Sequence, residues 1–177
     1  WTVTNGVCAP LSATTSIWRD LSPGPVIAAP DQTVCATTAT ISAVSLTTGT
    51  GIWSSSGSAT IASVQSETTV VSFLPTGVSQ FFWTVTNGVC PSTQATVNVQ
   101  QDDVPGPIGT VPAYTICSVT ASLSALTPTT GAGTWTSTTG ASVQNPQSAV
   151  TTAGNLQGGP NTFIWTITNG VCPPAAS

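Results

Sequence analysis

The sequence predicts an all-β protein built from tandem β-sandwiches, and three observations support this prediction. One motif occurs at Trp1–Cys8, Trp83–Cys90 and Trp165–Cys172, with two successive offsets of 82 residues. The apolar residues form short alternating runs, which are typical of half-buried strands. Clusters of Gly, Pro, Asn and Asp separate these runs, as turns separate the strands of a sandwich.

The repeat extends well beyond this motif. The same offset maps Cys35 onto Cys117 and Trp53 onto Trp135, and residues 9–90 align with residues 91–172 without a gap. Self-similarity at a fixed period indicates an array of structural repeats. The chain is therefore expected to be a stretch of a longer array.

The phase of the repeat predicts the domain boundaries. Residues 1–20 correspond to the terminal strands of a preceding repeat, and residues 21–102 form one complete immunoglobulin-like repeat. Residues 103–177 are expected to form a second such repeat that lacks its last strand. The boundaries fall in Pro-containing linkers, where prolines cannot donate to a sheet and stiffen the connection.

The complete repeat contains enough alternating runs for a sandwich of six or seven strands, which is the size of an immunoglobulin-like domain. Ile41 is expected to point inward, and Phe81, Trp83 and Val85 should share one face of a strand because side chains alternate with a period of two. The predicted strands cover residues 39–43, 52–54, 59–64, 69–74, 81–86 and 94–100.

Two glycine-containing segments are interpreted as breaks in this pattern. Gly49-Thr50-Gly51 is expected to interrupt the chain before the strand that contains Trp53. Asn87-Gly88 predicts a hairpin with both residues at the centre of a type I′ turn, because both central positions of that turn need positive φ.

The charge composition excludes several classes of function. The chain has one Arg, no Lys, no His and five acidic residues. It therefore has no basic surface for nucleic acid or for anionic lipid, and it has no apolar run long enough to insert into a membrane. A surface with so little charge is either hydrated by Thr and Ser or packs against copies of the same chain.

The five cysteines allow two pairings within the repeat pattern. The first pairs Cys35 with Cys90 and Cys117 with Cys172, and leaves Cys8 to an upstream cysteine. The second pairs Cys8 with Cys35 and Cys90 with Cys117, across the linkers. The first is preferred because it closes each sandwich on itself, and disulfides indicate an oxidising compartment. The wide spacing of the cysteines and the lack of His argue against zinc.

The tryptophans are interpreted mainly as core residues. Trp53, Trp83, Trp135 and Trp165 recur at equivalent positions, as expected of side chains that fill the space between two sheets. Trp18 has Gln100 as its counterpart, so it is expected to be exposed or packed at a domain junction. A sugar-binding face would need exposed aromatic residues, for which the candidates are Trp18, Phe82 and Tyr114.

No catalytic site is expected. The chain has no His or Lys, and its Ser and Thr residues have no candidate base beside them. Asp102 and Asp103 are adjacent in a linker rather than placed as a catalytic carboxylate pair. Together with Asp20 they are weak candidates for Ca²⁺ ligands at the linkers, although a solvated turn is the preferred interpretation.

Three segments together carry a resemblance to a known family: 30–41, from Pro30 to Ile41; 49–54, from Gly49 to Ser54; and 82–90, from Phe82 to Cys90. The chain resembles the Ig-like or PKD-like repeats of giant cell-surface adhesins of Bacteroidota, including gliding-motility adhesins. The second copy departs from this pattern at Ala113-Tyr114.

The resemblance implies a long protein, secreted by the type IX system and anchored at the bacterial cell surface. We therefore expect a non-enzymatic structural and adhesive repeat without cofactor, as part of a stalk or an adhesin filament. The alternatives are a subunit of an assembled extracellular fibre or sheath and a carbohydrate-binding module. The expected partners are neighbouring repeats, other copies in a filament, and a surface or glycan ligand.

Overall fold

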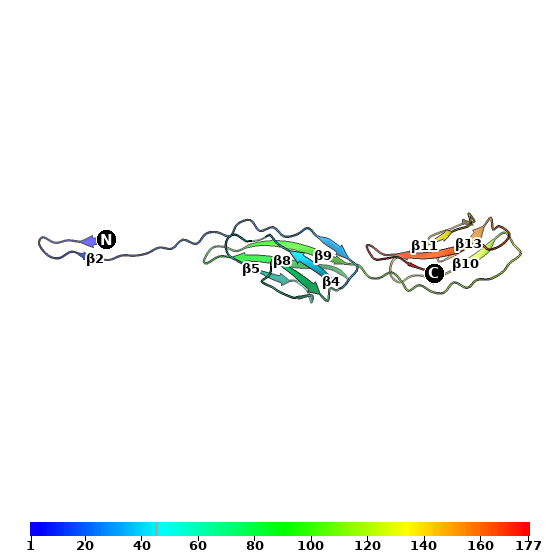
Figure 1. Cartoon of the computed structure of the whole chain (residues 1–177), viewed down its shortest axis with the longest axis horizontal. Helices are drawn as coiled ribbons and strands as arrows, with labels where there is room; N and C mark the ends of the chain where they lie inside the picture. Colours follow the sequence, from blue (N-terminus) through cyan, green and yellow to red (C-terminus); the bar gives the residue numbers. More distant parts are fainter. Residues whose placement is uncertain (45) are drawn as a thin grey trace.

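The computed structural model describes residues 1–44 and 46–177 and has an elongated shape (Figure 1). An extended N-terminal arm leads into a first sandwich, and a second sandwich follows in line with it. Every regular element within the described residues is a strand. No helix of the described residues is long and apolar enough to cross a membrane.

The strands fall into three groups along the chain. The arm contains β1 (Thr2–Val3) and β2 (Leu11–Ser12). The first sandwich contains β3 (Gln32–Val34), β4 (Thr38–Ser42), β5 (Thr50–Ser55), β6 (Thr60–Ile61), β7 (Thr68–Ser72), β8 (Gly77–Thr86) and β9 (Thr93–Gln101). The second contains β10 (Ala121–Ser124), β11 (Ala132–Ser137), β12 (Ser142–Val143), β13 (Val150–Gly154), β14 (Phe163–Thr168) and β15 (Ala175–Ala176).

The first sandwich consists of two sheets. One has the order β3-β9-β8-β5 and the other has the order β4-β7-β6. Neighbouring strands are antiparallel except for β3, which runs parallel to β9 with Gln32 opposite Val99 and Val34 opposite Gln101. This parallel pair places the residue after β3 at the same end of the sandwich as the residue after β9.

The core of the first sandwich confirms the predicted alternation. Ile41, Phe81 and Val85 are fully buried, and Trp83 is 1% exposed. The rings of Trp53 and Trp83 pack together with their centroids 5.1 Å apart. All four repeated tryptophans are buried, as predicted, and the pair in the second sandwich has the same centroid separation.

Some local predictions were wrong. The run 59–64 forms a strand only at β6, because Val64 instead accepts a backbone hydrogen bond from Trp53 across the sandwich. The segment around Gly51 belongs to β5 rather than to a break. A Cβ on Gly51 would lie 2.0 Å from the ring of Trp83, so a glycine is needed where this indole covers the strand.

The hairpin at residues 87–92 was predicted, but its turn was assigned to the wrong residues. Cys90 N donates to the carbonyl of Asn87, which makes Gly88 and Val89 the central pair. Gly88 has φ of 51°, whereas Asn87 and Val89 do not have positive φ. The turn is therefore displaced by one residue from the predicted type I′ turn.

The second sandwich repeats this architecture with a smaller sheet. Its sheets have the orders β11-β14-β15 and β10-β13-β12. The strand β15 has two residues, whereas its counterpart β9 has nine. Residues 114–116, the counterparts of β3, do not form a strand.

The arm is exposed along its whole length. Its two strands pair Thr2 with Ser12 and Val3 with Leu11, and every residue from 1 to 22 is exposed. Trp18 is 91% exposed. Of the two predicted environments for Trp18, the structure shows the exposed one.

Candidate functional site: the inter-domain junction

A disulfide joins the two sandwiches, which neither pairing expected from the sequence included. Cys35 is bonded to Cys172 with a Cα–Cα distance of 4.9 Å, and the thiols of Cys8, Cys90 and Cys117 are free. The predicted pairs Cys35–Cys90 and Cys117–Cys172, and the alternative pairs Cys8–Cys35 and Cys90–Cys117, are therefore wrong. The bond is a staple between domains rather than a closure within one.

The parallel pairing of β3 with β9 explains the error. Cys35 follows Val34, which lies opposite the last residue of β9, whereas Cys90 lies in the hairpin before the first residue of β9. Nine residues of strand separate these two ends by roughly 30 Å. A disulfide needs Cα atoms within about 7 Å, so the cysteines of one sandwich cannot meet.

The linker between the sandwiches receives the hairpin turn of the second one. Val171 N donates to Oδ2 of Asp102 at 3.1 Å, and Asn169 Nδ2 donates to the carbonyl of Asp103 at 2.8 Å. The Asp102 N–H donates to the carbonyl of Val34 at 2.9 Å, which ties the same residue to β3. Asp102 thus bridges both sandwiches next to the disulfide.

The linker before the first sandwich has the same contacts, one repeat earlier. Val89 N donates to Oδ2 of Asp20 at 2.9 Å, and Asn87 Nδ2 donates to the carbonyl of Leu21 at 2.8 Å. Cys90, the counterpart of Cys172, donates from its thiol to the carbonyl of Asp20 at 3.4 Å. The junction is therefore a repeated device in which an Asp caps the turn of the domain that follows it.

Glycine is required at the centre of each capped turn. Gly88 and Gly170 both have φ of 51°. A Cβ would lie 1.8 Å from the Asp20 carboxylate at Gly88 and 1.7 Å from the Asp102 carboxylate at Gly170. The Asn-Gly-Val-Cys sequence that defines the repeat thus fits the junction as well as the hairpin.

Further contacts hold the linker to both neighbours. In the first sandwich, Thr76 donates from its Oγ1 to Oδ1 of Asp103 at a distance of 2.7 Å. Gly106 N donates to the carbonyl of Thr130 at 3.1 Å in the second sandwich. Pro105 is buried, as is its counterpart Pro23. These contacts support the expectation that the linker is stiff.

The staple outweighs the single hydrogen bonds of the junction. The bond closes a loop with a sequence separation of 137, which in the chain-entropy model is worth about 5 kcal/mol. A single hydrogen bond contributes about 1 kcal/mol net, and one to a charged group about 1.5–3 kcal/mol. The disulfide therefore makes the largest free-energy contribution at the junction. The Asp contacts set the orientation of the two sandwiches relative to the linker.

The three weak calcium candidates all act as hydrogen-bond acceptors at the linkers. Asp20 and Asp102 cap turns, and Asp103 accepts from Thr76. No group of three metal-ligating side chains occurs in the described part of the chain. The geometry assigns these carboxylates a role in the junction without requiring an ion.

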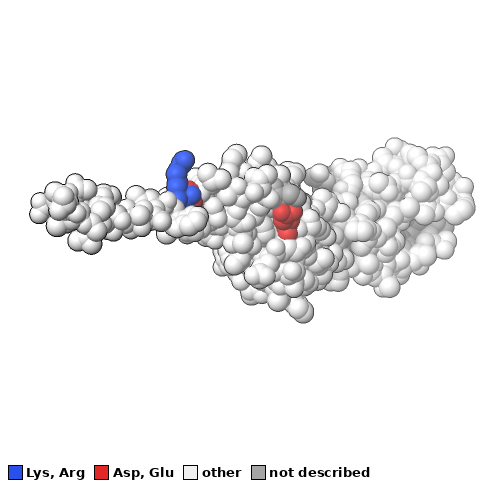
Figure 2. Space-filling model, turned by 60° about the vertical axis from the view of Figure 1, so that its left-hand side comes forward, with Lys and Arg blue, Asp and Glu red and all other residues white. Residues whose placement is uncertain are grey.

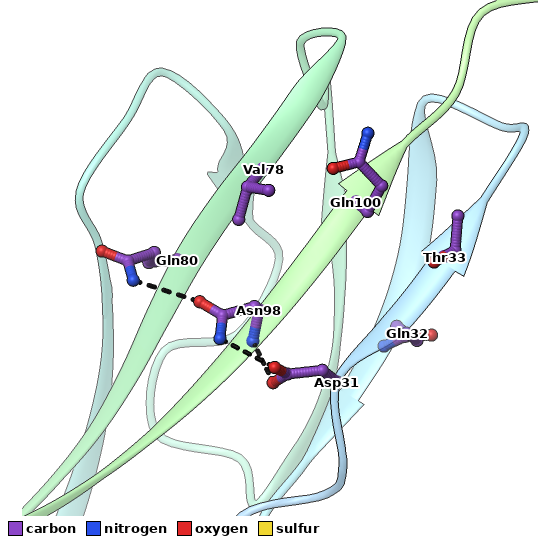
Figure 3. A pocket seen from close by; sticks show the side chains of 7 residues that line it. All are labelled: Asp31, Gln32, Thr33, Val78, Gln80, Asn98 and Gln100. Atoms are coloured by element: carbon purple, nitrogen blue, oxygen red, sulfur yellow. Dashed lines mark hydrogen bonds between the residues drawn. The ribbon is translucent and has the colours of Figure 1, made fainter.

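A second candidate site is a shallow polar hollow on the outer face of β3, β9 and β8 (Figure 3). Gln80 Nε2 donates to Oδ1 of Asn98 at 3.1 Å, and Asn98 Nδ2 donates to Oδ2 of Asp31 at 2.8 Å. The Asn98 side chain, and then its backbone N–H, lower the pKa of Asp31 from its ordinary value of 3.8. Because these side chains satisfy one another's hydrogen-bonding groups, the chain of hydrogen bonds from Gln80 through Asn98 to Asp31 stabilises the edge of the sheet.

The polar hollow is not part of the repeat. Its residues Asp31 and Gln32 correspond to Ala113 and Tyr114 in the second copy. A site that serves the whole array would be expected in each copy. The junction meets this condition and the hollow does not.

The aromatic candidates for a sugar site do not gather on one surface. Trp18 lies on the arm, Phe82 lies on β8 of the first sandwich, and Tyr114 lies in the second sandwich, where its hydroxyl donates to the carbonyl of Ser122. A carbohydrate platform needs such rings side by side. These three residues do not form one.

Figure 2 shows a face of the molecule with few charged side chains. The whole chain has one Lys or Arg and five acidic residues. Many apolar side chains are exposed as well, among them Ile17, Trp18 and Val89. The surface therefore offers little electrostatic repulsion to a second copy.

Sequence reasoning found the residues of the junction without finding their partners. The fixed spacing of Cys35 and Cys90 was visible, but the direction of β3 relative to β9 was not. The recurrence of an Asp at positions 20 and 102 at the same offset as the recurring Asn-Gly turn was the available signal.

Comparison with solved structures shows the fold. The chain is similar to the structure of Sidekick-1 immunoglobulin domains 1–5, with a TM-score of 0.58, 12% identity, and coverage of 90% of this chain and 38% of that one. It is also similar to Sidekick-1 immunoglobulin domains 1–4, with a TM-score of 0.58, 10% identity, and coverage of 92% and 49%. The chain is therefore a tandem of immunoglobulin-like β-sandwiches.

These similarities are similarities of structure, at a sequence identity of 10–12%. The chain spans less than half the length of either Sidekick-1 structure. The insect immune protein hemolin gives a TM-score of 0.49 at 12% identity, with coverage of 99% of this chain and 53% of that one, which supports no inference. No known protein family matches the sequence. No curated protein matches it either.

Proposed function

We propose that this chain is a stiff, non-enzymatic spacer within a long extracellular protein of the bacterial surface, acting in a stalk or an adhesive filament. The Cys35–Cys172 staple carries the proposal, because it joins consecutive sandwiches covalently at a junction that hydrogen bonds already orient. A disulfide of this kind suits an oxidising, extracellular environment. The resemblance to repeats of Bacteroidota adhesins supports the bacterial surface.

A spacer needs a fixed angle between its domains. Tandem domains move relative to each other by default when their interface is small. Here the linker is held by Asp102 to both sandwiches and by Gly106 to the second one. Adhesion would then come from many weak contacts presented at a fixed reach, which multivalency converts into avidity.

The test compares the parent chain with Cys172→Ser by small-angle X-ray scattering under non-reducing conditions. Without the staple, the two sandwiches are expected to sample several angles, so the scattering curve should require an ensemble instead of one rigid shape. Cys8→Ser is the matched control, since Cys8 is an exposed free thiol in the arm. A parent curve that itself requires an ensemble of inter-domain angles would contradict the spacer proposal, and a rigid curve for Cys172→Ser would assign the stiffness to the hydrogen bonds instead of the staple.

A fibre or sheath subunit is the second candidate function, and a specific observation favours it. The surface has few charges, and apolar side chains of the arm are exposed. Electron microscopy of the native protein separates the candidates. Thin single threads support the spacer, and thick filaments with helical order support the fibre subunit.

A further inference from the structure

The polar hollow on the first sandwich has hydrogen-bonding groups that the chain itself leaves unused (Figure 3). Gln80 Nε2 donates to Asn98, and its Oε1 has no partner within the described residues. Gln100 donates to the Gln101 carbonyl and to Asp102, and its Oε1 has no partner in the described part of the chain either. Since an amide nitrogen carries two N–H groups, the hollow presents both donors and acceptors to the solvent.

The carboxylate of Asp31 also keeps some of its capacity to accept hydrogen bonds. Its Oδ1 accepts from the Asn98 backbone N–H, and its Oδ2 accepts from Asn98 Nδ2, each at 2.8 Å. A carboxylate has about four lone-pair positions, and Asp31 is exposed. Because Asn98 fixes the carboxylate by two bonds, the remaining acceptors have a set direction before a ligand arrives, which lowers the entropic cost of binding.

Apolar side chains flank these polar groups along β8. Val78, Gln80 and Phe82 point outward, because Phe81 and Trp83, which alternate with them, are buried in the core. Val78 is 62% exposed, and Phe82 is partly exposed. Outward residues on one strand are roughly 7 Å apart, so the Gln80 amide lies between two apolar surfaces. The hollow therefore combines hydrogen-bonding groups with apolar contact area.

The backbone beneath the hollow is not available to a ligand. β9 lies between β3 and β8, and β8 lies between β9 and β5. The peptide groups of both strands are thus paired within the sheet, whereas a peptide that binds as an added strand needs a free edge. A ligand on this face is therefore recognised by side chains alone.

The charge of the hollow favours a neutral ligand. Its lining has the carboxylate of Asp31 and no cationic side chain, and the one basic residue of the chain, Arg19, lies in the arm. An anionic ligand would be repelled by Asp31 without gaining an ion pair. Hydroxyl groups both donate and accept, so they match the donors and acceptors of the hollow.

We propose that the polar hollow is a binding site for a neutral glycan of hexose or N-acetylhexosamine units. Adjacent sugar hydroxyls bind the Asp31 carboxylate and the Gln80 amide, and the apolar C–H face of the ring contacts Phe82. The hollow crosses three strands, about 10 Å, which suits one or two sugar units. This inference goes beyond the spacer role, because a stiff spacer needs no ligand.

The second copy keeps the inward side chains of β8 and changes the residues of the hollow. Phe81 and Trp83 recur as Phe163 and Trp165. The changed residues and their counterparts are Asp31 and Ala113, Gln80 and Thr162, and Phe82 and Ile164. A sandwich of this repeat therefore folds without the polar residues of the hollow. We assign the glycan site to the first sandwich and not to the second.

The first measurement applies the 177-residue protein to an array of immobilised oligosaccharides. The array holds neutral hexose and N-acetylhexosamine chains together with chains that carry uronic or sialic acid. Binding to neutral chains is expected. A neutral disaccharide from a bound chain is then titrated into isotope-labelled protein, and the side-chain amide NMR signals of Gln80, Asn98 and Gln100 are expected to shift.

Two variants give the hollow the residues of the second sandwich. Asp31→Ala introduces the residue found at Ala113, and Phe82→Ile introduces the residue found at Ile164, so both variants are expected to fold. Asp31→Ala is expected to weaken binding about tenfold or more, because it removes a charged acceptor. Phe82→Ile is expected to weaken binding about threefold, because it removes the aromatic face.

Gln94→Ala is the matched control. Gln94 lies exposed on the outer face of β9 outside the hollow, and its counterpart in the second copy is Ala176. This variant should bind the disaccharide like the parent. Hydrogen exchange at the Asn98 amide separates a lost ligand contact from a loosened strand. In Phe82→Ile the exchange should be unchanged although binding is weaker.

The inference is overturned if the array retains no neutral glycan or only acidic ones. It is also overturned if the NMR shifts map to another surface, or if Asp31→Ala binds like the parent. Neither result changes the scattering expected of the stapled sandwiches, so failure of the glycan site and failure of the spacer proposal are distinguishable.

Discussion

The two sandwiches share one repeat but differ in how completely their cores are covered. The first has β9 across its sheet and fully buries Phe81, Val97 and Val99. The second has the two-residue β15 in that place and leaves Phe163 partly buried. The repeated Trp pair is nevertheless packed with its ring centroids at the same 5.1 Å in both. The centre of the sandwich is therefore formed by β5 and β8 or their counterparts, and β9 adds the outer part of the core.

The sharpest test of this comparison is removal of the central indole from each sandwich. Trp83→Ala and Trp165→Ala are each expected to cost about 3–5 kcal/mol. Each variant should lose protection in the sandwich that contains the substituted indole, because the two Trp pairs are packed alike at the centres of the two cores. Hydrogen exchange measured by mass spectrometry follows the two separately. Trp18→Ala, at a 91% exposed position, should change neither, and equal loss of protection in both sandwiches of a single Trp variant would contradict this assignment.

A smaller effect is expected at the junction, from Gly170→Ala. The new Cβ would lie 1.7 Å from the Asp102 carboxylate at a backbone φ of 51°, so the cap is expected to weaken by about 1–3 kcal/mol. The Val171 amide should then exchange faster, and dithiothreitol should reduce Cys35–Cys172 faster.

A matched control separates the effect of the Asp contact from that of backbone strain. Gly140 also has positive φ, at 79°, but a Cβ there would meet no atom within 4 Å. Gly140→Ala should leave the Val171 amide and the disulfide unchanged. Loss of protection at Val171 in both variants would show that strain, rather than the Asp102 cap, is responsible.

The smallest expected effect is a pH dependence confined to the first sandwich. The hydrogen bonds from Asn98 lower the folded-state pKa of Asp31 below 3.8. The carboxylate therefore contributes stability above the unfolded pKa, and this contribution is lost as the pH falls through the folded pKa. Protection of the Asn98 amide should fall in that range below 3.8 in the parent but not in Asp31→Asn. The second sandwich has Ala113 at this position, so a similar loss there would contradict this assignment.

Local pattern was enough to place β4, β5, β7, β8 and β9, although it missed β3. The alternation of Phe81, Trp83 and Val85 correctly placed them in the core, because burial of one face imposes a period of two on a strand. Gly51 was misinterpreted, since its role depends on the ring of Trp83, which lies on another strand.

The disulfide could not be predicted by such reasoning. Its partners are 137 residues apart and lie in different domains. The choice depends on β3 running parallel to β9, a non-local pairing of three residues that leaves no periodic signature. The Asp–turn contacts were hidden for the same reason, because each spans nearly 70 residues of sequence.

The position of the staple also determines how the chain responds to a pulling force. Tension applied at the two termini passes from Cys35 to Cys172 through the covalent S–S bond. Residues 36–171, which include nearly all of both sandwiches, lie inside the closed loop and carry none of that tension. Stretching can therefore extend the arm and the last few residues, while the folded domains cannot unravel to lengthen the chain until the disulfide is reduced.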